Sequence, residues 1–283
     1  MGLIRKSSET TLHWPAGISL ARPVFFMDQQ HSPIVAQSTT RLDTKENAGD
    51  LAARDLVVVY DSLQECPYLD SQVARMPLEY PRRRLFPDDL DRLLELGYRR
   101  TGSMLYRTAC PNCRECIPTR LDVTEFRITR SMKRILNRAD RQLEVRWGKP
   151  QVDAERLRLF NAHREARRLS QRGPADLADY HEFLVATCVE TSEIAFRVDG
   201  QLIGIAIVDL GRDCVNAVYT HFDPEYGRYC IGTLAILKQI QWAIQTSRVY
   251  VYLGLFVAEN EHLNYKDRFR PQQRLVDGQW RNV

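Results

Sequence analysis

Three cysteines at regular spacing are the residues of this sequence whose types most directly imply chemistry. Cys110, Cys113 and Cys116 follow one another at intervals of three, and Cys66 lies upstream of them. Thiolates at this spacing in a tight loop can converge on one centre, and tetrahedral zinc takes four such ligands. An iron–sulfur cluster accepts the same spacing. The four cysteines are therefore candidate metal ligands. Zinc, an iron–sulfur cluster and a thiol-lined loop without metal all remain open.

The charge of the chain is unevenly distributed. The 283 residues carry a formal net charge of +4. Residues 82–149 contain 17 Lys and Arg against 9 Asp and Glu, which gives +8 for this segment and −4 for the rest. Clustered cations attract phosphates and release counterions on binding, so this segment predicts a polyanion partner. The alternative is a solvated, arginine-rich surface.

The composition is typical of an ordinary soluble protein, with 44% hydrophobic and 27% charged residues. No stretch approaches the ~18 continuous apolar residues of a membrane helix. The first 22 residues contain no long apolar run, so we expect no signal peptide. Seven cysteines, an odd number, argue against a disulfide framework. Together these features predict a cytoplasmic protein without membrane segments.

Hydrophobic periodicity and turn residues predict the elements that must position these side chains. Strands are expected at 56–60, which we take as buried, and at 99–106, 119–123, 193–198, 201–210, 215–222 and 249–256. Helices are expected from Pro87 to Gly97 and at 130–141, 153–170 and 231–246, with a capping-box start at Asp179 for one more. Asp199-Gly200 predicts a hairpin turn. The class is therefore α/β (α+β).

Three regions follow from this pattern. Residues 1–55 show weak periodicity and many polar residues, and we interpret them as an irregular or disordered extension. Residues 56–150 form an N-terminal domain that carries the cysteine motif. Residues 151–283 form a C-terminal domain in which strands, a loop-to-helix turn and a final strand are laid out as in an acyltransferase sheet.

Several motifs in the same order resemble the aminoacyl-tRNA–protein transferase family. The N-terminal matches are Cys66-Pro67-Tyr68-Leu69, Gly97-Tyr98-Arg99-Arg100, Tyr106 to Arg120 and the basic stretch Arg130 to Leu136. The C-terminal matches are Ala217 to Pro224, Gly232 to Leu237, Tyr250 to Gly254 and Asn264 to Pro271. The resemblance covers roughly residues 60–280.

The resemblance implies a GNAT-like C-terminal domain and transfer of leucine from leucyl-tRNA to proteins that begin with Asp or Glu. It also implies a role in N-degron protein degradation. Leu69, which stands where the eukaryotic arginyl branch has a second cysteine, favours the bacterial leucyl branch. Departures at Leu255 to His262, and His221 in place of an aromatic residue, leave arginyl-tRNA open as the donor.

The implied reaction is attack of an N-terminal amine on an activated ester, which requires no cofactor for the chemistry. Backbone N–H groups near Gly232 and Thr233 are candidates for stabilising the oxyanion, because a helix start offers unpaired donors. His221 could accept a proton, and Asp223 could bind the incoming ammonium. The structural alternatives are close packing at Gly232, a core histidine and a simple turn at Asp223.

The acidic acceptor needs a cation, and an arginine–carboxylate pair is the natural choice. The candidates around the cysteine loop are Arg99, Arg100, Arg107 and Arg120. Lys266 and Arg268 could contact the acceptor end of tRNA, and Tyr219 and Tyr252 could line the pocket for the transferred side chain. Solvated cations and core tyrosines are the alternatives.

Two other classes of function are compatible with parts of the sequence. An acyl-CoA N-acetyltransferase would usually carry a glycine-rich pyrophosphate loop at the helix start, and Arg228 to Thr233 does not fit that pattern. A metal-stapled nucleic-acid-binding module would explain the basic segment and the cysteines, but it would leave the second half of the chain unused.

Overall fold

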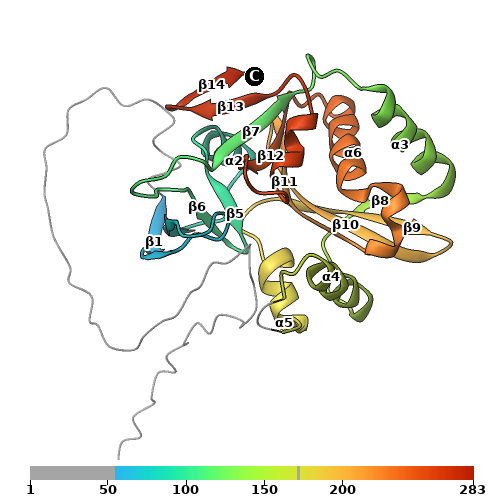
Figure 1. Ribbon diagram of the computed structural model, residues 1–283, viewed down its shortest axis with the longest axis horizontal. Coiled ribbons are helices and arrows are strands. Elements are labelled where there is room, and N and C mark those ends of the chain that lie inside the picture. The colour runs from blue at the N-terminus through green and yellow to red at the C-terminus, as the bar shows by residue number, and fades with distance from the viewer. Residues whose placement is uncertain (1–54, 171–172) are drawn as a thin grey trace, which may run out of the picture.

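The computed structural model describes residues 55–170 and 173–283, so the predicted extension at 1–55 lies outside the described residues except for Asp55. The described α-helices are α2 (Pro87–Glu95), α3 (Arg130–Gln142), α4 (Ala154–Ala166), α5 (Leu177–Tyr180) and α6 (Ile231–Gln245) (Figure 1). The described residues also form a π-helix, η1 (His181–Val185), and two 3₁₀-helices, η2 (Pro224–Tyr229) and η3 (Asn264–Arg268). In the described part of the chain, no helix is long and apolar enough to cross a membrane.

A small antiparallel sheet lies in the N-terminal half. Its strand order is β1 (Leu56–Tyr60), β4 (Leu78–Pro81), β6 (Met104–Tyr106), β5 (Arg99–Thr101), and beside it β2 (Leu63–Glu65) pairs with β3 (Val73–Arg75). The prediction that β1 is buried is wrong. Val58 and Val59 are 56% and 55% exposed because β1 is an edge strand. The single strand predicted at 99–106 is a hairpin, β5 and β6, which turns at Gly102 with φ +55°.

A larger sheet of eight strands forms the body of the molecule. Its order is β14 (Gln279–Asn282), β13 (Gln273–Val276), β7 (Ile117–Asp122), β12 (Tyr250–Phe256), β11 (Cys214–Phe222), β10 (Gln201–Leu210), β9 (Thr191–Val198), β8 (Glu144–Gly148). The hairpin at Asp199-Gly200 is confirmed, and both residues have positive φ. β7 and β8 precede the predicted boundary at residue 150 but belong to this sheet, so the regions 56–150 and 151–283 share it. The boundary itself stays a prediction.

The strands β11 and β12 separate after a short paired stretch. They run parallel and are joined through α6, but their pairing covers only Cys214–Asn216 against Tyr250–Tyr252. Both strands continue beyond this point, to Phe222 and Phe256. The sheet therefore divides at Asn216, and side chains from other elements enter between the two strands.

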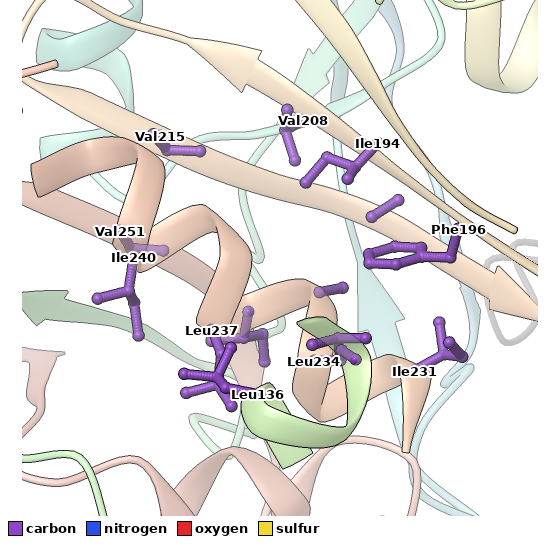
Figure 2. Packing of buried hydrophobic residues seen from close by; sticks show 14 of the residues in the cluster. Leu136, Ile194, Phe196, Val208, Val215, Ile231, Leu234, Leu237, Ile240 and Val251 are labelled. Atoms are coloured by element: carbon purple, nitrogen blue, oxygen red, sulfur yellow. The ribbon is translucent and has the colours of Figure 1, made fainter. Parts of the chain in front are cut away.

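Two hydrophobic layers cover the faces of the large sheet. α3 and α6 lie on one face, where Leu136, Leu234 and Leu237 pack on Phe196 and Val251 (Figure 2). α4 and α5 lie on the other face (Figure 1). Side chains that alternate with those of the first face pack against these two helices. The predicted α/β class is confirmed.

Two helix predictions needed adjustment. α4 begins after Asp153, which caps it, but ends at Ala166 rather than at residue 170. The capping box predicted to start at Asp179 starts at Asp176 instead, and Asp179 supplies its second carboxylate from the third helical position. The reciprocal hydrogen bonds of a capping box are present, as predicted, but they lie three residues earlier in the chain.

Candidate functional site

Arg99 enters the large sheet at the point where β11 and β12 separate. Its Nη1 donates to Oδ1 of Asn216 at 3.0 Å, and its Nη2 donates to the carbonyl of Ala217 at 3.1 Å. Asn216 is the last residue of β11 that pairs with β12. Arg99 belongs to β5 of the small sheet and is only 8% exposed. The small sheet thus places a buried cation between β11 and β12 of the large sheet, where these two strands separate.

Lys266, on η3, approaches the same place from the other end of the chain. Its Nζ donates to the carbonyl of Leu255 at 2.5 Å, and the residue is 6% exposed. Gly254 lies between the two cations with φ +92°, at a bulge in the pairing of β12 with β7. A Cβ atom at Gly254 would lie 2.9 Å from Nη2 of Arg99 and 3.3 Å from Nζ of Lys266. Only glycine allows this approach.

The Arg99–Lys266 pair has no acidic partner among the described residues. Burial, and next the charge of Arg99, lower the pKa of Lys266 to about 7. The carboxylate of Asp209 is occupied elsewhere: it pairs with Arg100 at 2.9 Å and accepts bonds from Asn216 and Thr191. Two buried cations bonded only to neutral oxygens form a site suited to a carboxylate ligand.

The other predicted acceptor arginines lie in different settings. Arg100 is held by Asp209 and by the carbonyl of Gly102, so its donors face inward. Arg120 donates to Tyr252 Oη at 2.9 Å and lies over the rings of Tyr250 and Trp280. Arg107 is exposed and lies over the ring of Tyr98. Arg268, which was predicted to contact tRNA, is also exposed.

The N-terminus of α6 presents unpaired amide donors beside the end of β11. Cys230 precedes the helix in the left-handed conformation and gives no side-chain cap, and the first turn holds no acidic residue. Gly232 and Thr233 are partly exposed there. A Cβ atom at Gly232 would meet only the ring of Phe222, at 3.8 Å. The amides and the dipole of α6 suit a developing oxyanion.

Asp223 and His221 occupy different environments. Asp223 caps η2 and accepts a bond from the N–H of Glu225 at 3.0 Å, in agreement with the turn alternative, and it is partly exposed. His221 is fully buried among the rings of Phe160 and Tyr180, and neither of its ring nitrogens has a hydrogen-bond partner. Burial lowers its pKa well below the usual value. This placement does not favour proton acceptance from a substrate amine.

The end of β11 is anchored by residues that the sequence analysis did not select. Nδ1 of His163 in α4 lies 3.2 Å from the carbonyl oxygen and 3.3 Å from the amide nitrogen of Phe222, and its tautomer decides whether it donates to the first or accepts from the second. Arg167 lies over the Phe222 ring and bonds Nδ1 of His262 at 3.2 Å. His163 and Arg167 lie far from Phe222 and His262 in the sequence, so no local signal points to these contacts. They fix Phe222 beside Gly232.

The two predicted pocket tyrosines do not lie together. Tyr219 packs against Phe160 and Phe183 on the face covered by α4. Tyr252 is buried near the C-terminal hairpin, where it contacts Arg120 and Trp280. A single pocket for the transferred side chain therefore does not contain both.

The four motif cysteines lie in one neighbourhood as free thiols. Cys110 is buried, and Cys66 and Cys113 pack against the same cluster. Burial, and then the three other cysteines, raise the pKa of the Cys116 thiol to about 12. Over residues 55–170 and 173–283, no three His, Cys, Asp or Glu side chains are grouped so as to hold a metal ion. The metal centre stays a prediction.

Comparisons with known proteins cover most of the described chain. The family model for the N terminus of arginine-tRNA-protein transferase matches residues 64–134, and that for its C terminus matches 155–276. An aspartate/glutamate leucyltransferase of Hahella chejuensis is 35% identical over 230 residues, which are 80% of this chain and 97% of the relative. A protein of the same name from Methylobacillus flagellatus is 34% identical over 77% of this chain and 88% of its own length.

Solved structures give more distant similarity. FemX superposes with a TM-score of 0.40 at 7% identity, over 76% of this chain and 83% of that chain. The C-terminal domain of a putative lysylphosphatidylglycerol synthetase from Agrobacterium fabrum gives 0.41 at 13% identity, over 51% of this chain and 48% of that one. The sequence matches carry the assignment: the chain belongs to the arginine-tRNA-protein transferase family and is an aminoacyltransferase that acts on an aminoacyl-tRNA and a protein.

Proposed function

We propose that this chain transfers leucine from leucyl-tRNA to the N-terminal Asp or Glu of proteins. The buried Arg99–Lys266 pair is the observation that supports the acidic acceptor, because its donors lack a carboxylate among the described residues. The names of the relatives support both leucine and the acidic acceptors. The carboxylate of the acceptor residue would be bound by the side-chain donors of these two cations.

The amide donors of α6 lie beside Phe222 at the end of β11, and the cation pair contacts Asn216 of the same strand. The acceptor amine attacks the carbonyl carbon of the aminoacyl ester, a C–N bond forms, and the bond from that carbon to the ribose oxygen breaks. The nitrogen loses one proton and the ribose oxygen gains one, so the reaction balances through solvent. With a pKa of about 7.7–8.0, part of the free amine is already neutral near pH 7.

The amides at Gly232 and Thr233 are placed to stabilise the negative charge on the carbonyl oxygen during this attack. Holding the amine and the ester in one site supplies the remaining acceleration, because it replaces a bimolecular encounter. We assign no cofactor to the chemical step. Arginine remains the second candidate for the transferred residue, since the matching family models carry that name.

The N-terminal addition of leucine would mark the acceptor protein for the N-degron pathway. We also propose the cytoplasm as the place of action, because aminoacyl-tRNAs are used there.

The test is transfer of labelled leucine, and in parallel of labelled arginine, from charged tRNA to peptides that begin with Asp, Glu, Lys or Ala. Leucine on the Asp and Glu peptides alone is the expected result. Arginine on the same peptides would move the protein to the other branch. Equal transfer to the Lys and Ala peptides would contradict an acidic acceptor site.

A further inference from the structure

The outer face of α3 and the loop before it carry six exposed cations: Arg127, Arg130, Lys133, Arg134, Arg138 and Arg141. The first turn of α3 holds no acidic residue. The buried side of the helix, Met132, Leu136 and Ala139, is apolar and faces the core. The cations therefore point outward as one continuous strip, which we call the α3 strip.

The α3 strip is not neutralised by neighbouring acids. Among the described residues, none of its six cations forms an ion pair. Asp140, the acidic residue of the helix, pairs with Lys238 at 2.8 Å. Three exposed arginines elsewhere, Arg75, Arg146 and Arg212, each have an acidic partner.

The α3 strip continues to the N-terminus of α6. α3 packs against α6, with Leu136 against Leu237 in the core between them (Figure 2). Nη1 of Arg138 donates to the carbonyl of Arg228, which lies three residues before the first residue of α6. Arg228 is itself exposed. The strip and the amide donors of α6 thus form one positively polarised surface.

We propose that the α3 strip, continued by Arg228, binds the sugar–phosphate backbone of the double-helical acceptor arm of tRNA. This docking would bring the aminoacylated end to the N-terminus of α6, and the inference rests on the proposed transfer function. A helix of 13 residues spans about 20 Å, enough for several successive phosphates.

The composition of the strip favours duplex backbone over single-stranded nucleic acid. α3 contains no aromatic residue, so it offers no platform on which unpaired bases could stack. Arg228 has one aromatic neighbour, Tyr229, but this ring is 2% exposed and lies under Arg228. The strip therefore offers mainly cations, which recognise phosphates and the shape of an RNA helix. An acidic protein or an anionic membrane would also be attracted to these cations, so the test includes a representative of each.

The test measures binding of tRNA without an attached amino acid to the full chain, by fluorescence anisotropy over a range of salt concentrations. The variant Arg130→Gln/Lys133→Gln/Arg134→Gln should bind tRNA about 10–100-fold more weakly. The slope of log Kd against log salt concentration should be smaller than that of the wild type by about 2–3. The control is Arg158→Gln, an exposed arginine on α4 at the opposite face of the sheet, for which we expect less than about a 2-fold change. Thermal midpoints show that each variant is folded.

Unchanged affinity and salt dependence in the folded triple variant would overturn the proposal. Equal loss of binding to a single-stranded RNA of the same length would overturn the duplex preference, and so would tighter binding to phosphatidylglycerol vesicles or to a poly-glutamate peptide than to tRNA. Because this tRNA carries no amino acid, the binding measurement does not depend on the transfer reaction. If transfer to Asp and Glu peptides fails but tRNA binding depends on the α3 strip, only the proposed function is lost.

Discussion

The guanidinium of Arg99 and the ammonium of Lys266 meet at the bulge of β12, beside the Gly254 backbone. One comes from the small N-terminal sheet and the other from the turn after the last central strand. Each is bonded to neutral oxygens at 2.5–3.1 Å. The two halves of the chain must therefore be assembled before this cationic site exists.

Removing either cation should abolish selection of acidic acceptors. In Lys266→Met, kcat/KM for an Asp peptide should fall about 10–100-fold, because a hydrogen bond to a charged group contributes roughly 1.5–3 kcal/mol. Transfer to an Ala peptide should change little. The measurement is the ratio of kcat/KM for Asp and Ala peptides.

Arg107→Gln is the control for that prediction, since Arg107 is an exposed cation outside the buried Arg99–Lys266 pair. It should leave the ratio unchanged. A Lys266→Met enzyme that still prefers Asp over Ala to the wild-type degree would remove Lys266 from the acceptor site.

The acceptor affinity should depend on pH through Lys266. Its pKa is lowered to about 7 by burial and by Arg99, so the free site loses one of its two charges as pH rises above about 7. The acceptor carboxylate is ionised throughout this range. We expect KM for the Asp peptide to increase from about pH 7 to pH 9, measured by steady-state transfer. Lys266→Arg, which keeps its charge, should flatten that rise; an unchanged pH profile in this variant would contradict the assignment.

The same shift has a consequence for stability. Unfolding returns Lys266 to a pKa of about 10.4, so between about pH 7 and that value the unfolded chain binds more protons than the folded chain. The contribution of Lys266 therefore makes the folded state more stable as pH rises through this window. Denaturant unfolding at pH 7 and pH 9 should show a smaller pH-dependent gain for Lys266→Met than for the wild-type chain.

The sequence predicts the strands and the helix from β9 to β12 because their signals are local, but it does not predict the hairpin of β13 and β14. The Asp199-Gly200 turn and the apolar face of α6 each depend on residues close together in the chain. The prediction that β1 is buried is wrong for a related reason: its run of valines indicates a strand, but its exposure depends on its position at the edge of the sheet.

The sequence predicts which residues belong to the candidate site but not how they are arranged in space. Arg99 and Lys266 were both selected from motifs, but as ligands for different substrates. Their meeting depends on where β11 and β12 separate, which no local pattern encodes. The anchoring of Phe222 by His163 and Arg167 was missed for the same reason, because it joins α4 to a strand end across the sheet.

His221 provides a test of the proton-acceptor hypothesis. We expect His221→Phe to keep kcat close to wild type, because the ring lies fully buried and both nitrogens lack hydrogen-bond partners. The variant should also resist acid better. The pKa of His221 is lowered by burial, so the unfolded state takes up the proton first as pH falls through about 6.5, and this destabilises the wild-type fold.

The measurements are single-turnover transfer and thermal unfolding at neutral pH and at about pH 5. A kcat that drops about 100-fold in a folded His221→Phe enzyme would restore His221 as a proton acceptor.

The amide of Gly232 can be tested without altering a side chain that contacts substrate. Gly232→Pro removes one N–H in the first turn of α6, where that group has no partner within the helix. If it stabilises the oxyanion, kcat should fall about 100–1,000-fold. Gly232→Ala keeps the N–H, and its Cβ atom would come no closer than 3.8 Å to the Phe222 ring, so this variant should stay active.

Proline at this position also disfavours the helical conformation of Ile231, so some loss of thermal stability is expected in Gly232→Pro. Binding of uncharged tRNA separates the two effects: a variant that binds tRNA like the wild type but transfers slowly has lost a donor and not its fold. Full transfer activity in such a variant would exclude the Gly232 amide from the oxyanion site, and the N–H of Thr233 would be the next donor to examine in the same way.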